Sequence, residues 1–437
     1  MMMIEKNNRK VINAWCSYDI ANSVYSLIVA AALFPIYYER VTLEAFGGEM
    51  VTLFGHAIKN TVLYDYSIAL GYAIIILITP LLSGIADMGS YRKRFMVFFT
   101  IVGSAACSGL FFFNGSNIGF GLLMTILAVI GWAGATVYYN SFLPIIATPR
   151  LHNIVSAKGF AWGYLGSMLL FIFNIFTIYT WRFWGFGSEE AAYRFSFLLV
   201  GLWWIGIALF SFRHLTEFKA KTKIDTDILS KGFREIAEVA RNLFRQRIMN
   251  LFLVSFLFLS MGVQTILLVA TLFGRVELHI GTIELIVVIL LIQFLAMFGS
   301  FVFARVSNRF GNFSSLLLML AIWVGICVAG YFIQNAVQFY ILAIFLGFVM
   351  GGIQSQARST YAMLIPSDTT DTASYFTFYD ITEKIGIVVG MFGFGFIEQI
   401  SGSMRNSVAL LSVFFLIAFV ALLFAAGKRK LMADGFE

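Results

Sequence analysis

Twelve long apolar runs constrain the fold of this chain more than any other feature of its sequence. A helix needs about 20 mainly apolar residues to cross the hydrocarbon core of a bilayer. Hydrophobic residues make up 60% of the 437 residues and charged residues only 12%, which leaves more apolar surface than a soluble domain can bury. The predicted spans are residues 12–38, 64–86, 95–113, 118–142, 158–180, 194–212, 248–273, 283–304, 314–333, 339–364, 375–397 and 405–427.

The runs are continuous, and this predicts helices, because the strands of a membrane barrel give alternating segments of about ten residues. The first run is too long for a cleavable signal peptide, and Asp19 and Asn22 interrupt it. We therefore expect an all-α polytopic membrane protein with twelve transmembrane helices, surrounded by the lipid bilayer.

Lys and Arg are divided unevenly between the two sets of loops. An even number of spans places both termini on one side, and that side carries 21 Lys and Arg residues against six in the opposite loops. Cytoplasmic loops of membrane proteins carry such an excess, so both termini are predicted to be cytoplasmic. These loops also account for the net charge of +7, and no nucleic-acid partner is expected.

The order of the runs indicates an internal duplication. Six runs, a basic stretch and six further runs make two parallel halves, which is the arrangement of major facilitator transporters. In the basic stretch, Phe233, Ile236, Ala240 and Leu243 recur at helical spacing, so part of it is expected to be a helix. The predicted organisation is an N-terminal six-helix bundle at 1–212, a cytoplasmic basic linker at 213–247 and a C-terminal six-helix bundle at 248–437.

Glycines repeat in the fifth and eleventh runs with the same offsets. The two sets are Gly159, Gly163 and Gly166, and Gly386, Gly390 and Gly393. Small residues at such offsets allow close helix packing and, taken singly, indicate nothing more. Their recurrence in equivalent runs supports two pseudo-symmetric six-helix bundles, the major facilitator fold.

Residue types that would indicate a cofactor, a metal site or an enzyme are scattered along the chain. Cys16, Cys107 and Cys327 lie far apart in apolar runs, and the four histidines do not cluster. No phosphate-binding Gly-Lys-Ser/Thr loop occurs, so ATP is not expected to drive the protein directly. No motif pairs a nucleophile with a base. The sequence therefore predicts no enzyme, no cofactor and no metal ion.

The loop after the second run combines glycines, an acid and a basic cluster. Its members are Gly84, Asp87, Gly89, Arg92 and Arg94. The loop resembles the signature loop of the major facilitator superfamily, in which an acid at a helix end can pair with arginines and with a neighbouring helix N-terminus, holding the cytoplasmic side closed. The alternative is a basic cluster beside a turn. In the second half Asn308 stands where an acid is usual, so a weaker latch is expected there.

Ionisable side chains inside the membrane are costly and are therefore candidates for function. Asp19 lies inside the first run, and Asn22 shares its helical face. A polar stripe of this kind must point into the bundle or into a cavity, so both residues are candidates for binding substrate or protons.

The eleventh run holds three ionisable residues. Asp380 and Lys384 are one turn apart and can pair. Glu383 is then left over, either protonated or paired with Arg358 of the tenth run. Two interpretations stay open: a structural salt-bridge cluster at the cytoplasmic end, and a role in binding substrate or protons.

Neutral polar side chains in other runs outline a candidate cavity. They are Tyr25, Tyr139, Asn140, Gln264, Thr265, Gln293, Gln354 and Tyr379. Taken singly, each is more readily explained by an interhelical hydrogen bond than by a ligand contact.

Four sequence blocks carry a narrower resemblance. They are residues 13–23, 156–166, 356–366 and 379–384. Together they resemble the vacuolar amino-acid effluxer family linked to autophagy and its bacterial permease relatives. The resemblance implies a twelve-helix major facilitator fold, export of neutral amino acids in the fungal members and, for a bacterial member, a place in the inner membrane. Met261 departs from the pattern, because many relatives carry an acid there, so coupling through that position is not expected.

These observations predict a secondary active transporter that works by alternating access. The expected substrate is a small polar metabolite, with amino acids suggested by the resemblance, and proton coupling would run through Asp19, Asp380 or Glu383. We expect a monomer. The alternative is a lipid-moving or partner-binding membrane protein on a transporter-like fold, which a largely apolar lateral cleft would favour. A closed polar central cavity would favour transport of small solutes.

Overall fold

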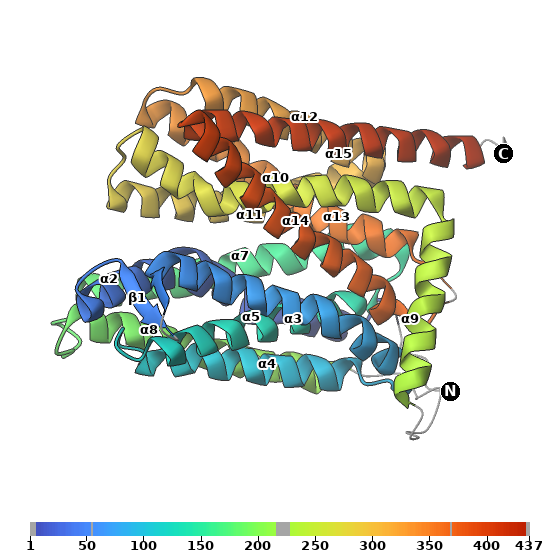
Figure 1. The fold of residues 1–437 in the computed structure, drawn as a ribbon. Coiled ribbons are helices and arrows are strands. Elements are labelled where there is room, and N and C mark those ends of the chain that lie inside the picture. Colours follow the sequence, from blue (N-terminus) through green and yellow to red (C-terminus); the bar gives the residue numbers. More distant parts are fainter. Residues whose placement is uncertain (1–5, 54–55, 216–227, 368, 434–437) are drawn as a thin grey trace.

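The computed structural model describes residues 6–53, 56–215, 228–367 and 369–433. Within these residues almost all of the chain is helical, and the helices form two bundles, drawn one above the other in Figure 1. Both termini and helix α9 (Ile228–Arg245) lie at the same end of the molecule, on the right of the figure. We call this end the terminal face and the other end the distal face.

The first bundle begins with a span made of three consecutive helical segments. These are α1 (Arg9–Val24), the π-helix η1 (Tyr25–Ala32) and α2 (Leu33–Phe46). The other long helices are α3 (Asn60–Gly89), α4 (Arg92–Gly109), α5 (Ile118–Ser141), α7 (Pro149–Tyr179) and α8 (Glu189–His214). The short elements are the 3-10 helix η2 (Leu110–Phe112), α6 (Leu143–Ile146) and an antiparallel hairpin of β1 (Met50–Leu53) and β2 (His56–Lys59).

The second bundle contains six long helices. They are α10 (Arg247–Glu277), α11 (Thr282–Phe310), α12 (Asn312–Phe332), α13 (Ala336–Leu364), α14 (Thr372–Ser401) and α15 (Met404–Ala433). In the described part of the chain, eleven spans are long and apolar enough to cross a membrane. The remaining long helix, α14, has 30 residues and carries the charged residues predicted for the eleventh run, which lower its hydropathy.

The helices extend beyond the apolar runs that predicted them. The first span continues to Phe46 rather than to residue 38, and α7 begins at Pro149 rather than at residue 158. Backbone hydrogen bonding carries a helix past the point where its side chains become polar, and hydropathy marks only the apolar part. The π-helical segment η1 was not predicted at all, because an apolar run gives no signal for a change of helical pitch.

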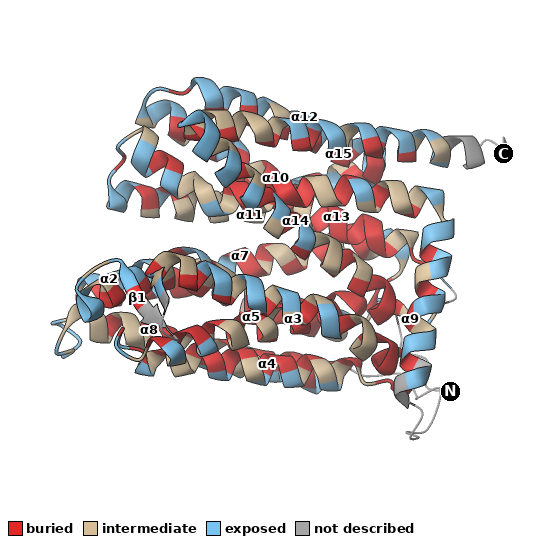
Figure 2. Ribbon diagram, viewed as in Figure 1, coloured by how far each residue is buried: buried red, intermediate tan, exposed pale blue. Residues whose placement is uncertain are grey.

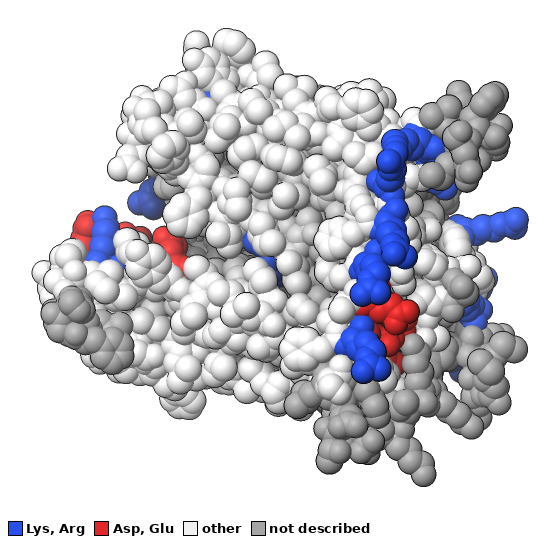
Figure 3. Space-filling view, turned by 45° about the vertical axis from the view of Figure 1, so that its right-hand side comes forward, with Lys and Arg blue, Asp and Glu red and all other residues white. Residues whose placement is uncertain are grey.

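The apolar face of α9 differs from the predicted one. The residues of α9 that pack inward are Gly232, Ile236, Val239 and Leu243, whereas Phe233 is 61% exposed. The stripe is therefore rotated by about 50° around the helix axis from the one expected, and Ile236 and Leu243 belong to both. The packing of α9 on α3 determines which face of α9 is buried. The two helices are so close that a Cβ on Gly84 of α3 would lie 2.3 Å from the carbonyl oxygen of Gly232. Figure 3 shows Lys and Arg side chains gathered along the outer side of α9.

Glycines produce the same close helix contact in both bundles. In the first bundle a Cβ on Gly163 of α7 would lie 2.5 Å from the Ser23 hydroxyl of α1. In the second, a Cβ on Gly390 of α14 would lie 2.5 Å from the carbonyl oxygen of Met261 on α10. Equivalent helices thus approach each other through equivalent glycines, which supports the pseudo-symmetry inferred from the repeated spacing.

The two bundles meet along helices from the middle of each half. Helices α3 and α5 contact α14, and α7 contacts α11 and α13. Burial is concentrated on the sides of the helices that face other helices, and exposed apolar residues cover the outside of both bundles (Figure 2). This is the pattern expected for bundles whose outer surface lies in lipid.

We predict that Gly131→Ala lowers the free energy of unfolding of the purified protein by about 1–3 kcal/mol, and its melting temperature with it. The added Cβ would lie 2.3 Å from the Cα of Gly103 on α4. Gly119→Ala, on the same helix, is the matched control, since its Cβ would meet no atom within 4 Å. Thermal unfolding in detergent measures both. Equal melting temperatures for the two variants would contradict the close α4–α5 contact.

Candidate functional site

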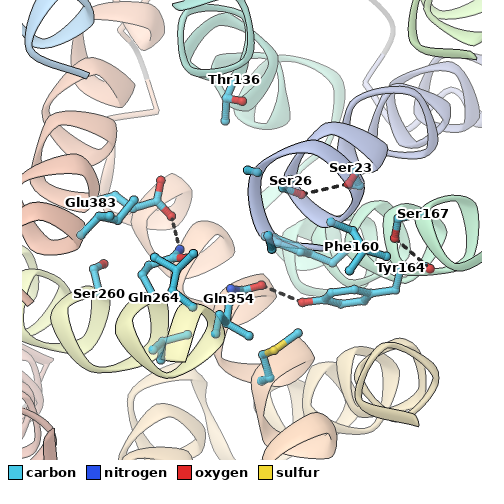
Figure 4. Close-up of a pocket in the computed structure, with 18 of the residues that line it drawn as sticks. Ser23, Ser26, Thr136, Phe160, Tyr164, Ser167, Ser260, Gln264, Gln354 and Glu383 are labelled. Atoms are coloured by element: carbon cyan, nitrogen blue, oxygen red, sulfur yellow. Dashed lines mark hydrogen bonds between the residues drawn. The ribbon is translucent and has the colours of Figure 1, made fainter. Parts of the chain in front are cut away.

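A cavity of about 290 Å³ lies between the two bundles, and we call it the central cavity. Its walls come from α1, η1, α3, α5, α7, α10, α11, α13 and α14. Figure 4 shows polar side chains from both bundles directed toward this space, among them Ser26 and Tyr164 on one side and Gln264 and Glu383 on the other. The lining also reaches Ala32 and Thr271, which lie toward the distal face, where the bundles are parted (Figure 3).

Most of the predicted site residues line the central cavity. These are Asp19, Asn22, Tyr25, Tyr139, Asn140, Gln264, Gln293, Gln354, Arg358, Tyr379 and Glu383. Three predicted residues do not line it. Asp380 and Lys384 are buried behind it, and Thr265 is buried with its hydroxyl oxygen lacking a hydrogen-bond partner. The reason is register: a helix presents only one face to the cavity, and these three side chains lie off that face.

An arginine of the second bundle is bound inside the first. The Nε of Arg358 donates to the Ser156 hydroxyl at 2.9 Å, and its Nη2 donates to the Ser156 carbonyl oxygen at 2.9 Å. Its Nη1 donates to Asn140 Oδ1 at 3.3 Å and lies 3.5 Å from Oδ2 of Asp19. Arg358 comes from α13, whereas Asp19, Asn140 and Ser156 come from α1, α5 and α7. The guanidinium therefore ties the two bundles together at the inner end of the cavity.

The carboxylate of Asp19 uses its two oxygens differently. Oδ2 accepts a hydrogen bond of 2.6 Å from the Tyr139 hydroxyl and also faces Arg358. Within the described residues, every hydrogen bond of this carboxylate is made by Oδ2. The side chain lines the cavity, and its Oδ1 takes part in none of these hydrogen bonds.

Gly159 makes room for this ion pair. A Cβ at that position would lie 2.5 Å from Asp19 Oδ2 and 3.0 Å from Arg358 Nη2. Aromatic rings close the remaining sides, since the guanidinium lies 4.7 Å from the ring centroid of Trp15 and 4.2 Å from that of Phe160. The predicted family block at 156–166 thus supplies a backbone carbonyl, a hydroxyl, a ring and the gap beside them.

A second charged cluster lies on α14. The ammonium of Lys384 donates to Asp380 Oδ1 at 3.0 Å and to Glu383 Oε2 at 2.7 Å. Glu383 Oε1 accepts a hydrogen bond of 3.1 Å from Gln264 on α10. The predicted pairing of Asp380 with Lys384 is present, whereas the suggested pairing of Glu383 with Arg358 is wrong, because Lys384 already lies beside Glu383 and Arg358 is held in the first bundle.

The terminal end of the cavity is closed by a charged contact between the bundles. The carboxylate of Asp87, at the end of α3, accepts hydrogen bonds from Arg92 at 2.5 Å and from the backbone N–H groups of Ala373 at 3.1 Å and Ser374 at 2.8 Å. Those two amides belong to the first turn of α14, where a carboxylate is favoured by the helix dipole. Arg92 also donates to the carbonyl oxygen of Thr370, so the whole contact crosses between bundles.

The other predicted gating residues pack locally. The backbone of α9 packs directly against Gly84 at Gly232. A Cβ on Gly89 would lie 2.3 Å from the ring of Tyr91. The guanidinium of Arg94 lies 4.9 Å from the centroid of that same ring. These three residues therefore shape the loop in which the buried Asp87–Arg92 pair sits.

The equivalent contact in the second half is built from amides. Asn153, near the start of α7, donates to Asn308 Oδ1 at 2.8 Å and to Asn312 Oδ1 at 2.9 Å. Its own oxygen accepts from Asn312 at 2.9 Å and from the Ser359 hydroxyl at 2.7 Å. Neutral hydrogen bonds replace charge-assisted ones here, as expected from Asn308, and such bonds are individually weaker.

Several cavity residues were missed from the sequence. They are Tyr72, Trp132, Thr136, Phe160, Ser167 and Ser260. Helical periodicity could have found three of them. Trp132 and Thr136 precede Asn140 by two turns and one turn on the same face of α5, and Ser260 precedes Gln264 by one turn on α10. Tyr72 gave no such signal, because Ile68 and Ile76, one turn away from it on α3, are apolar. In the described part of the chain, no group of three or more His, Cys, Asp or Glu side chains could hold a metal ion.

The family model described as "Vacuole effluxer Atg22 like" matches residues 7–433. The chain belongs to the Atg22-like family. The MFS-type transporter YxiO of Bacillus subtilis is 30% identical over 420 residues, which cover 96% of this chain and 95% of YxiO. Autophagy-related protein 22 of Saccharomyces cerevisiae is 24% identical over 399 residues, covering 79% of this chain and 74% of that protein. The resemblance identified from the four sequence blocks is confirmed.

Solved structures of major facilitator transporters share the fold of this Atg22-like chain. The outward conformation of FucP aligns with a TM-score of 0.68 at 13% identity, covering 95% of this chain and 97% of FucP. The proton:xylose symporter XylE aligns with a TM-score of 0.71 at 11% identity, covering 94% of each chain. The predicted major facilitator fold is therefore confirmed. Together with the 30% identity to the MFS-type transporter YxiO and the apolar spans, this makes the protein a multi-pass membrane transporter of that superfamily.

We predict that Gly159→Ala lowers solute uptake by proteoliposomes at least tenfold, because the new methyl group forces Asp19 and Arg358 apart. The matched control is Gly206→Ala in α8, where a Cβ would meet nothing within 4 Å. Uptake is measured at equal amounts of inserted protein. Wild-type uptake by Gly159→Ala would show that the ion pair tolerates the displacement.

Proposed function

We propose that this Atg22-like protein is a secondary active transporter that moves a small polar solute by alternating access. The observation that carries the proposal is the asymmetry of the central cavity: it reaches toward the distal face, whereas three contacts between the bundles close it at the terminal face. A transporter of this kind exposes one site to each side in turn by moving one bundle against the other. Residues 1–212 and 248–437 are the two moving bundles, joined by the linker at 213–247.

The orientation follows from the excess of Lys and Arg on the terminal side. The terminal face is placed in the cytoplasm by the positive-inside rule, and the bacterial relative is consistent with an inner-membrane protein. The cavity then faces the exterior, and the structure corresponds to an outward-facing state. Export and import both require passage through this state, so the direction of transport is set by the gradients across the membrane.

The polar lining suits a small solute better than a lipid. Amides and hydroxyls from both bundles reach the cavity, among them Asn22, Gln264, Gln293 and Gln354. Small polar solutes can exchange water for these groups, whereas a lipid chain would leave them unpaired. Amino acids are the first solutes to test, given the family, and the protein is expected to act as a monomer because each chain contains its own cavity.

Proton coupling is proposed through Asp19. Its carboxylate both lines the cavity and holds Arg358, so a proton bound there would remove half of the ion pair between the bundles. Protonation from the cavity side would thus loosen the closed end, and deprotonation would restore it. The other charged groups near Asp19 are Arg358 and, from α7, Lys158, which instead donates to Asn13.

Alternating access is tested with a cysteine in the cavity. Ser26→Cys places a thiol in the lining, and the three native cysteines are buried, so background labelling is low. We predict that Asp87→Asn lowers the rate of labelling from the exterior several-fold, because loss of the charged latch at α14 favours the inward-facing state. Glu238→Gln, an exposed carboxylate on α9, is the control. Labelling that neither Asp87→Asn nor any solute changes would refute alternating access.

Proton coupling is tested by Asp19→Asn, which keeps the size of the side chain. We predict that this variant loses uptake driven by a pH gradient while still exchanging solute at equal pH. Asp65→Asn, the same change at an exposed carboxylate at the start of α3, is expected to leave uptake unaffected. If Asp19→Asn still responds fully to the pH gradient, Asp19 is not the coupling residue.

A further inference from the structure

The ionised side chains around the central cavity do not balance. In the first cluster, Asp19 and Arg358 compensate each other. In the second, the two carboxylates Asp380 and Glu383 share a single cation, Lys384. With all five groups ionised, the two clusters together carry one excess negative charge, in a part of the molecule where an uncompensated charge is costly. The further cation near Asp19 is Lys158, which is not part of the cavity lining and donates to Asn13.

The excess charge is also the accessible one. The side chain of Glu383 is 21% exposed and that of Asp19 is 10% exposed, and both line the cavity. The two cations are shielded, since the side chain of Arg358 is 3% exposed and that of Lys384 is 0% exposed. A solute entering the cavity therefore meets carboxylate oxygens and does not meet a free cation among the described lining residues.

Aromatic rings explain why the cations are out of reach. Trp15 and Phe160 cover the guanidinium of Arg358, and the ammonium of Lys384 lies 4.8 Å from the ring centroid of Trp132. Trp132 lines the cavity whereas Lys384 does not, and Figure 4 shows Glu383 pointing into the cavity. Both cations are thus already paired with carboxylates of the protein.

We propose that the central cavity recognises its solute through a protonated amine, with Glu383 as the counter-ion, and that a carboxylate on the solute contributes nothing to binding. This inference rests on the proposed transport function. An ammonium group neutralises the excess charge and donates hydrogen bonds to Glu383 and Asp19, whereas a carboxylate would add a second uncompensated negative charge. The solute class is therefore a small organic amine, and amino acids qualify through their amino group.

The remaining walls define the rest of the solute. Phe256, Leu259, Val263 and Ile266 line the cavity beside the polar groups and can cover a hydrocarbon body. Tyr25 and Trp132, whose ring centroids are 5.8 Å apart, offer aromatic faces of the kind that attract organic cations. A branched aliphatic or aromatic amine matches both features.

The test compares four compounds that share one hydrocarbon body: isoamylamine, leucinamide, leucine and 4-methylpentanoate. Only the amino and carboxylate groups differ among them. We predict that isoamylamine and leucinamide raise the melting temperature of the purified protein at least as much as leucine does, and that 4-methylpentanoate does not raise it. Stabilisation by 4-methylpentanoate equal to that by leucine, or no stabilisation by either amine lacking the carboxylate, would overturn the proposal.

Variants at Glu383 distinguish the effect of its charge on amine binding from any effect on the structure of the cavity. Glu383→Gln is expected to weaken the apparent affinity for isoamylamine at least tenfold, and Glu383→Asp, which keeps the charge, is expected to restore most of it. Glu284→Gln, at an exposed carboxylate at the start of α11, is the control. Unchanged affinity in a folded Glu383→Gln protein would remove Glu383 as the counter-ion.

The labelling of Ser26→Cys keeps this inference distinct from the proposed function. If labelling responds to a solute that carries no amine, the protein is a transporter and the amine proposal is wrong. If the accessibility of the cavity never alternates, the transport mechanism itself fails, whatever the four compounds do to the melting temperature.

Discussion

The contact between the two bundles at the inner end of the cavity depends on the guanidinium of Arg358, which belongs to the second bundle and forms its hydrogen bonds with the first. The side chain of Arg358 extends from α13, and its partners lie on α1, α5 and α7. A buried charge without partners costs several kcal/mol, so separating the bundles at this point is unfavourable unless the charge is compensated in another way. Asp19 is the member of the group that also lines the cavity. Events in the cavity and closure at the terminal face therefore share one carboxylate.

The α14 cluster has the opposite character. Asp380, Glu383 and Lys384 lie on one helix, and their further partner Gln264 belongs to the same bundle. Moving the bundles apart leaves these hydrogen bonds intact, although it would separate Lys384 from the ring of Trp132 on α5. In the proposed mechanism, Glu383 would therefore present the same carboxylate to a solute in both states, whereas the surroundings of Asp19 would change between them. The proposal thus assigns solute binding to the α14 cluster and the response to bundle movement to the Asp19–Arg358 pair.

Much of the fold follows from the sequence because hydropathy and repeated glycine spacing are strong signals in a membrane protein. The spans, the two bundles and the pairing of Asp380 with Lys384 all depend on local periodicity. The partner of Glu383 could not be predicted this way, since the choice between Lys384 and Arg358 depends on where α13 meets the first bundle. The π-helix η1 and the rotated face of α9 were also missed, because apolar runs do not encode helical pitch and Phe233 is apolar yet faces outward.

Helix α9 has a consequence for how far the second bundle can travel. Its Gly232 backbone is seated against Gly84 of α3, and a single residue, Gln246, separates α9 from α10. As long as α9 stays packed on α3, the described chain between it and α10 is this one residue. In the proposed mechanism, a tilt of α10 then requires either a bend at Gln246 or the release of α9 from α3.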